Sequence, residues 1–253
     1  MNYTYDGTFE GLLSVVFTVF EKRDSRAVIE KKRDGALFGG IYVDTDISKA
    51  ERVYKKLCRV AGQKEANRLY TAFLSERSGI ENTLLAYIRG VIEEKSSIER
   101  IYMDAVVEVE RFSLRVVREA HRFKGFVRFR RLSDDTYYAI IEPECNVLPL
   151  VESHFTERFS DQNFVIHDMG REAALVYSKD NRKGYIARLT DINEELISYS
   201  SESTLLHTDE ERYIDLWRGY FEAVSIEGRK NLRCQQNFMP KKYWKNLTEV
   251  NMK

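Results

Sequence analysis

In the first half of the chain, apolar residues recur at the spacing of helices. One predicted helical face follows the candidate cap Thr8 and contains five apolar residues: Phe9, Leu12, Leu13, Val16 and Phe20. The same spacing predicts three helices within residues 44–95. Short strands are predicted at Tyr3 to Tyr5 and at residues 41–43, and the charged residues 23–34 are expected to form an exposed loop or a frayed helix.

Residues 97–123 are predicted to form one long helix. Its buried side is expected to carry five small or branched apolar residues: Val106, Val109, Val116, Val117 and Ala120. Four arginines fall on the opposite side and form a basic stripe: Arg111, Arg115, Arg118 and Arg122.

Beyond this helix the hydrophobic period changes from helical to alternating. The alternation predicts five strands, at residues 125–131, 136–142, 164–169, 173–178 and 184–189. A helix that begins near Pro149 is predicted between the second and the third strand.

The C-terminal part is predicted to be helical after a serine-rich surface loop at residues 198–203. A helix at residues 208–227 carries six large residues on one face that is typical of a core: Tyr213, Leu216, Trp217, Tyr220, Phe221 and Val224. A last short helix is expected from Pro240 to about Leu247.

Together these elements predict an α+β fold. It has a helix-rich N-terminal half, a long basic helix that leads into an antiparallel β-β-α-β-β-β segment, and C-terminal helices packed on that segment. Residues 1–96 are expected to form one lobe and residues 97–253 an α+β lobe, with one integrated domain as the alternative. Hydrophobic residues make up 43% and charged residues 32%, and no long uncharged apolar run is present, so neither a disordered chain nor a membrane-spanning one is expected.

The charges are balanced in total but segregated along the chain. Forty basic and forty acidic residues give a formal net charge of zero. Residues 1–110 carry a net charge of −1, residues 111–131 carry +7, residues 132–225 carry −11 and residues 226–253 carry +5. Two basic segments are therefore hidden in a neutral total, which is typical of an anion-binding face on an otherwise acidic surface.

The two basic segments supply the candidate nucleic-acid-binding residues. In the first, the strand predicted at residues 125–131 places Phe126, Arg128 and Arg130 on one face, where guanidinium groups can meet phosphates and a ring can stack on a base. In the second, amides that can read base edges accompany cations that can hold phosphates. The whole set is Arg111, Arg115, Arg118, Arg122, Lys124, Arg128, Arg130, Arg229, Asn231, Arg233, Gln235, Lys241, Lys242 and Tyr243.

Each basic segment also has a purely structural interpretation. The first can be an amphipathic edge strand whose arginines pair with the acidic residues 132–225. The second can be a C-terminal arm that packs over the core through Met239, Tyr243 and Trp244. The sequence leaves both interpretations open.

Motifs of the common enzyme classes are absent from the sequence. It has no phosphate-binding loop, dinucleotide fingerprint, zinc-protease motif or nucleophile elbow, so no cofactor is predicted. The histidines and cysteines lack the spacing of a metal site, so no metal is predicted either. The weak catalytic candidates are His121, Glu142 and His154. Few, unpaired cysteines and a start without the pattern of a secretion signal favour the cytoplasm.

An ordered set of short motifs extends over nearly the whole chain. It consists of Tyr5 to Leu13, His121 to Phe129, Tyr137-Tyr138-Ala139, Glu142-Pro143, Leu148-Pro149-Leu150, His154-Phe155, Arg158-Phe159, Leu216-Trp217, Tyr220-Phe221, Arg229, Asn231, Arg233 and Met239 to Trp244. Through this set the chain resembles a bacterial family described as probable DNA metabolism or DNA repair proteins. Members of that family are typically encoded beside a radical-SAM protein, and some are fused to a uracil-DNA-glycosylase-like domain.

The resemblance implies DNA as ligand and a separately encoded radical-SAM protein as partner, because this chain lacks the C-x-x-x-C-x-x-C cluster of a radical-SAM enzyme. Three hypotheses follow. The first is a DNA-binding protein of DNA metabolism or repair that contacts phosphates through the two basic segments. The second is an enzyme that acts on a nucleobase or nucleotide through His121, Glu142 or His154. The third is an interaction subunit whose basic face docks the partner protein.

Overall fold

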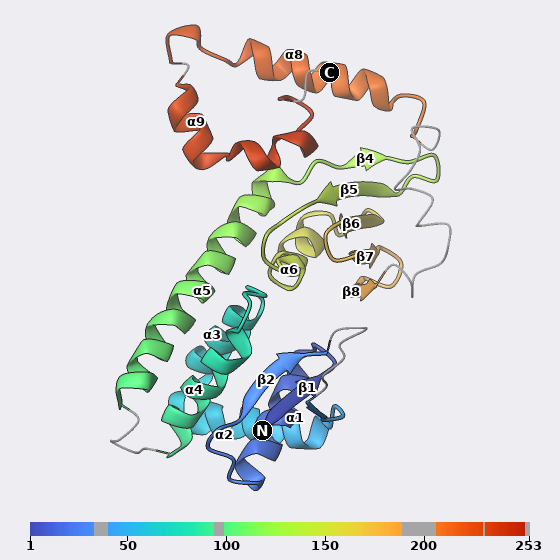
Figure 1. The fold of residues 1–253 in the computed structure, drawn as a ribbon. Helices are drawn as coiled ribbons and strands as arrows, with labels where there is room; N and C mark the ends of the chain where they lie inside the picture. Colours follow the sequence, from blue (N-terminus) through green and yellow to red (C-terminus); the bar gives the residue numbers. More distant parts are fainter. Residues whose placement is uncertain (33–39, 94–98, 189–205, 230, 251–253) are drawn as a thin grey trace. The chain divides into compact units, whose positions relative to one another are not determined.

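The computed structural model describes residues 1–32, 40–93, 99–188, 206–229 and 231–250. The chain forms two compact units, unit 1 at Met1–Val117 and unit 2 at Arg118–Lys253 (Figure 1). Both contain helices and strands, which confirms the α+β class. The serine-rich segment predicted as a loop at residues 198–203 lies outside the described residues.

Unit 1 contains a three-stranded parallel sheet with β1 (Asn2–Tyr5) between β2 (Val28–Lys31) and β3 (Ile41–Tyr42). The interpretation of residues 23–34 as loop or frayed helix was wrong, because β2 lies within them and buries Ile29 completely. Asn82 stabilises this edge strand: its Oδ1 accepts from the Ile29 N–H at 2.9 Å, and its Nδ2 donates to the Ile29 carbonyl at 3.2 Å. Because Asn82 lies far from Ile29 in the sequence, the local pattern of residues does not reveal this strand.

The helices predicted for unit 1 are present in the structure. In α1 (Phe9–Glu21), the Thr8 hydroxyl accepts from the Gly11 N–H at 3.0 Å, as expected of a helix cap. The three helices expected within residues 44–95 are α2 (Ile47–Ala61), α3 (Gln63–Phe73) and α4 (Ile80–Glu93). Their apolar faces join α1 and the sheet in one core.

The long helix α5 (Glu99–Phe126) contains residues of both units. Val109, Val116 and Ala120 are buried, as predicted. Val117 is 47% exposed, so its assignment to the buried side was wrong. It lies about 100° around the helix from Val116, on the side turned to solvent.

The strand predicted at residues 125–131 was wrong over most of its length. Gly125 and Phe126 still belong to α5, and only Arg130 and Arg131 form a strand, β4. The alternating faces expected for Phe126, Arg128 and Arg130 therefore do not exist. In this last turn of α5 the ring of Phe126 packs edge-on against the Phe123 ring, with 6.2 Å between their centroids.

Unit 2 contains a five-stranded sheet in the order β4-β5-β6-β7-β8, with β5 at Tyr137–Ile141, β6 at Phe164–Asp168, β7 at Ala173–Ser178 and β8 at Lys183–Arg188. The predicted β-β-α-β-β-β order is confirmed. The expected antiparallel arrangement was wrong for one pair, because β5 and β6 run parallel. The chain between them passes through α6 (Leu148–Arg158), and such a crossover returns the next strand in the same direction.

Helix α6 lies against this sheet (Figure 1), and aromatic rings form the core between them. The ring of Phe129 lies 5.1 to 5.7 Å from the rings of Phe155, Phe159 and Phe164, measured between centroids. All five residues of β6 are buried, which explains why Phe164, Val165 and Ile166 follow one another without alternation.

The helix predicted at residues 208–227 is present as α8 (Glu210–Ala223), but its supposed core face was wrong. Tyr213, Leu216 and Tyr220 are 58–59% exposed, and Trp217, Phe221 and Val224 are exposed as well. The spacing of apolar residues gives the direction of a helical face but not what covers it. Three short helices follow: η4 (Glu227–Arg229), α9 (Leu232–Phe238) and η5 (Lys241–Asn246). Among the described residues, no helix has the length and apolarity to cross a membrane.

Ile166 offers a test of the unit 2 core, since it is fully buried in the central strand. We expect I166A to lower the free energy of unfolding by about 2–5 kcal/mol. Both tryptophans lie in unit 2, so tryptophan fluorescence in a urea titration reports on this unit. The control I186A changes a residue that is 40% exposed on β8, so it should lower the free energy of unfolding clearly less. Equal losses for the two variants would contradict the assignment of Ile166 to the core.

Candidate nucleic-acid interface

The C-terminal arm is attached to the end of α5 by a buried hydrogen bond. Tyr243 on η5 is 4% exposed, and its hydroxyl donates to Glu119 Oε1 at 2.5 Å. The same carboxylate accepts from the backbone N–H of Glu144 at 2.9 Å and from that of Cys145 at 2.8 Å. One side chain of α5 thus holds both the loop after β5 and the C-terminal arm.

The ring of Tyr243 completes this attachment. Its centroid lies 5.1 Å from that of Phe123 and 5.7 Å from that of Phe126, both in the last turns of α5. In Figure 1 the red C-terminal segment accordingly lies beside the green end of α5. The two basic segments, separated by about a hundred residues of acidic sequence, therefore meet within unit 2.

Hydrogen bonding keeps the Glu119 carboxylate ionised. Burial alone would raise the pKa of Glu119, but the donors on Tyr243, Glu144 and Cys145 outweigh it and hold the pKa below its usual value. Burial and the neighbouring Glu119 charge raise the pKa of Tyr243, so its hydroxyl remains a donor.

A buried ion pair supports the same loop from its other side. Asp168 at the end of β6 is fully buried, and Arg171 donates to it at 2.9 Å. Arg171 also donates to the carbonyls of Pro143 at 3.2 Å and Glu144 at 2.9 Å. The loop that follows β5 is therefore fixed between Arg171 and Glu119.

Part of the second basic segment is neutralised by that loop. Lys242 pairs with Glu144 at 2.5 Å, and Lys245 pairs with Glu142. Tyr243, expected among the nucleic-acid-binding residues, is buried and offers no surface for stacking. For these residues the geometry agrees with the structural interpretation, an arm that packs over the core, and it adds ion pairs with the acidic residues 132–225.

Arg128 is also held internally. It donates to both carboxylate oxygens of Glu249, at 3.2 and 2.5 Å, and to the Gly125 carbonyl at 2.7 Å. Its guanidinium lies 5.6 Å from the ring centroid of Trp217, whose indole N–H donates to the same Glu249 at 3.1 Å. Arg128 thus joins α8 and the chain end rather than facing solvent.

Seven of the candidate cations have no ion pair with a carboxylate of the described residues. On α5, Arg118 and Lys124 are exposed, and Arg122 is half-buried close to Tyr243. The remaining members are exposed on β4 and on the C-terminal arm: Arg130, Arg229, Arg233 and Lys241. Arg111 and Arg115 lie on the unit 1 part of α5, where both are exposed and Arg111 pairs with Glu108 at 3.1 Å.

The two amide candidates lie on the arm as well. Asn231 caps α9, and its Oδ1 accepts from the Cys234 N–H at 3.0 Å. Gln235 is half-buried within α9. Asn231 therefore positions the helix that presents Arg233.

The three catalytic candidates do not form one site. His121 is exposed on α5, Glu142 is paired with Lys245, and His154 lies on α6 beside two cations. Burial and the charges of Lys124 and Arg158 lower the pKa of His154. Among the described residues no hydrogen bond joins any two of the three, and no cluster of three metal-ligating side chains is found.

Sequence reasoning missed a cavity beside α8. It has a volume of about 280 Å³ and is lined by Arg128, Phe129, Arg130, Glu210, Tyr213, Ile214, Trp217 and Thr248. Exposed aromatic rings thus line the same cavity as Arg130, which has no ion pair with a carboxylate in the described part of the chain. The signal was present in the sequence as a large aromatic face on residues 208–227, but it was read as core.

Fold and interface together define an α+β protein in which two basic segments, distant in sequence, are joined through Tyr243. The chain belongs to the family DUF4130, a domain of unknown function, whose model matches residues 78–249. No curated protein matches it. One solved structure, the DHH domain of a member of the s1p family of ribosomal proteins, is 14% identical, and the match covers 70% of this chain and 55% of that chain with a TM-score of 0.24. With so low a TM-score, this likeness carries no functional argument.

The Tyr243–Glu119 hydrogen bond can be tested by its pH dependence. We expect Y243F to destabilise unit 2 by about 1.5–3 kcal/mol at pH 7, because a hydrogen bond to a buried carboxylate is lost. Since the folded-state pKa of Glu119 is lowered, its carboxylate stabilises the fold above an unfolded-state pKa of about 4.3. This stabilisation is lost as the pH falls through the lower folded-state value.

Urea titrations followed by tryptophan fluorescence between pH 7 and pH 3 measure both effects. The stability difference between wild type and E119Q should shrink toward the acid end. Y220F, which removes a hydroxyl from a ring that is 59% exposed on α8, is the matched control and should leave stability unchanged. A difference for E119Q that stays constant with pH would contradict this assignment.

Proposed function

We propose that the protein binds nucleic acid through the joined basic segments of unit 2. The observation that carries the proposal is the packing of Tyr243 between Glu119, Phe123 and Phe126, which brings the arm that bears Lys241 to the end of α5. The proposed contact residues are the exposed or half-buried cations without an ion pair among the described residues: Arg118, Arg122, Lys124, Arg130, Arg229, Arg233 and Lys241.

Charge and exposure support phosphate as the group that these residues bind. A polyanion that meets such cations releases its own counterions, and this provides most of the sequence-independent affinity for nucleic acid. Lys242, Lys245 and Arg128 already have carboxylate partners, so they are expected to contribute to the fold rather than to binding. The proposed surface therefore contains only some of the cations of the two basic segments.

DNA is the nucleic acid that we propose, together with a role in DNA metabolism or repair beside a separately encoded radical-SAM protein in the cytoplasm. The support for this finer assignment is the resemblance of the ordered motifs, while the charges favour DNA and RNA equally. The three cysteines, all free thiols, are consistent with a reducing compartment.

Fluorescence anisotropy with labelled single- and double-stranded DNA and RNA at several salt concentrations tests binding. We expect R118A/R122A/K124A to weaken binding about tenfold or more at low salt and to flatten the plot of log K against log salt by about 2–3, since each lost phosphate contact removes about 0.7–0.9. A preference for DNA over RNA would support the finer assignment.

The matched control removes three exposed cations from the other end of unit 2, K179A/K183A/R188A on and beside β8. It makes the same change in net charge and should leave the salt dependence unchanged. Equal effects of the two variants would show a non-specific response to net charge and would contradict the proposed surface.

Co-expression with the radical-SAM protein encoded beside a family member tests the partner. We expect the tagged chain to retain that protein during purification after nuclease treatment. The R118A/R122A/K124A variant should retain it equally well, because the proposed surface binds DNA and not the partner. Recovery that depends on DNA, or that this variant abolishes, would contradict the separation of the two roles.

A further inference from the structure

Unit 1 contains a basic groove of its own. An open cavity of about 820 Å³ lies between α1, α2 and the end of α4. Its lining residues are Phe17, Phe20, Glu21, Arg52, Val53, Lys55, Lys56, Arg59 and Ile92. Four of the nine are cations and one is a carboxylate.

The cations form a stripe along α2. Lys49, Arg52, Lys56 and Arg59 fall within about 80° of one another at 100° per residue, and they extend about 15 Å along the helix axis. Ala50, Val53 and Leu57 on the same helix are buried in the core. The stripe is therefore fixed in direction by the apolar face of α2.

Aromatic rings form part of the groove beneath these cations. The guanidinium of Arg52 lies 4.8 Å from the ring centroid of Phe17, and Lys49 Nζ lies 5.5 Å from it. Phe17 and Phe20 are both partly exposed. Stacking on a ring orients a guanidinium without neutralising it, so Arg52 is held ready for an anion.

Most of the positive charge in the groove is unpaired. Lys55 pairs with Glu51 at 2.5 Å, but Arg52, Lys56 and Arg59 have no ion pair with a carboxylate of the described residues. Glu21 is the one acidic residue among the nine that line the groove. Three cations therefore remain for a ligand.

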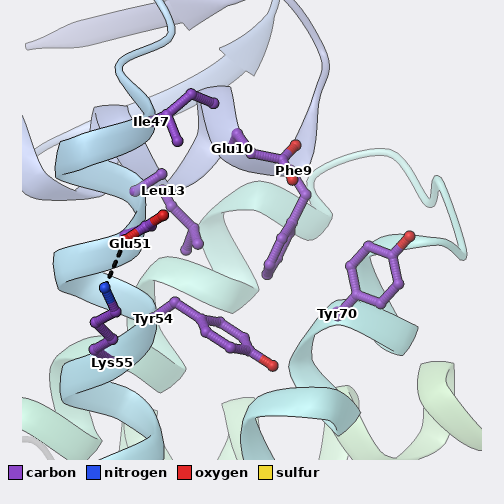
Figure 2. A pocket seen from close by; sticks show the side chains of 9 residues that line it. Phe9, Glu10, Leu13, Ile47, Glu51, Tyr54, Lys55 and Tyr70 are labelled. Atoms are coloured by element: carbon purple, nitrogen blue, oxygen red, sulfur yellow. Dashed lines mark hydrogen bonds and ion pairs between the residues drawn. The ribbon is translucent and has the colours of Figure 1, made fainter.

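The other side of α2 has the opposite character. There a separate cavity of about 420 Å³ is lined by apolar residues together with the carboxylates of Glu10 and Glu51 and two tyrosines (Figure 2). In Figure 2 Lys55 is directed to Glu51, with which it forms an ion pair. The helix thus separates an acidic, apolar cavity from a basic groove.

We propose that the groove formed by Arg52, Lys56 and Arg59 is a second binding site of this chain for the phosphate backbone of nucleic acid. The row from Arg52 to Arg59 is about 10 Å long, which matches about three successive nucleotides at a rise of 3.4 Å each. The choice of DNA rests on the proposed function, whereas the choice of a polyanion rests on the groove alone. An acidic peptide is the competing ligand, but the partly exposed rings beside the cations suit stacked bases better.

Salt-dependent DNA binding by the full-length chain tests this site. We expect R52Q/K56Q/R59Q to bind DNA about tenfold more weakly at low salt and to flatten the log K against log salt plot by about 2–3. Glutamine keeps the helix propensity and the apolar stems, so circular dichroism should show an unchanged fold. K64A/R77A/R26A removes three exposed cations of unit 1 that do not line the groove and should bind like wild type.

The outcomes separate this site from the surface of unit 2. If R118A/R122A/K124A weakens DNA binding and R52Q/K56Q/R59Q does not, the proposed function stands and the groove is not a site. If only the groove variant weakens binding, the groove stands and the unit 2 surface fails. If the wild type binds polyglutamate through the groove and does not bind DNA, both assignments are overturned.

Discussion

The carboxylate of Glu119 is the interaction on which the architecture of unit 2 depends. A buried charge is costly unless hydrogen bonds satisfy it, and here three donors do so, from Tyr243, Glu144 and Cys145. These donors come from the C-terminal arm and from the loop after β5, while Glu119 itself lies on α5. One charged group therefore joins three segments that are distant in sequence, and Arg171 fixes the loop from the other side.

Much of the fold was predictable because its signals are local. The cap at Thr8, the helix that begins near Pro149 and the order of strands in unit 2 follow from side chains and their nearest neighbours. Two of the misses share one cause, which is that the deciding contact is distant in sequence. The strand at Ile29 is stabilised by Asn82, and α5 continues past residue 123 where Tyr243 packs against Phe123 and Phe126.

The positive charge of the candidate site was predictable from the sequence, but which of its cations remain accessible to a ligand was not. The net charges of successive sequence segments revealed two basic segments. They could not show that Lys242 and Lys245 pair with the loop after β5 or that Arg128 pairs with Glu249. The net charge also concealed the basic groove of unit 1. Helix α2 carries five cations and one acidic residue, but it lies within residues 1–110, whose net charge is −1. A helical wheel of residues 47–61 would have shown that stripe, since four of its cations share one side.

Burial of the acidic partner separates the cations that the fold needs from those that we propose to bind a polyanion. Arg128 and Arg171 each pair with a carboxylate that is nearly or fully buried, Glu249 and Asp168. A buried carboxylate without its cation is strongly destabilising, so these arginines are not free to exchange their partner for a phosphate. Cations on an exposed helix side, such as Arg118 and Arg59, have no ion pair with a buried carboxylate of the described residues. Exposed charge that the fold does not need is therefore where a polyanion can bind without a loss of stability, and both units of this chain present it.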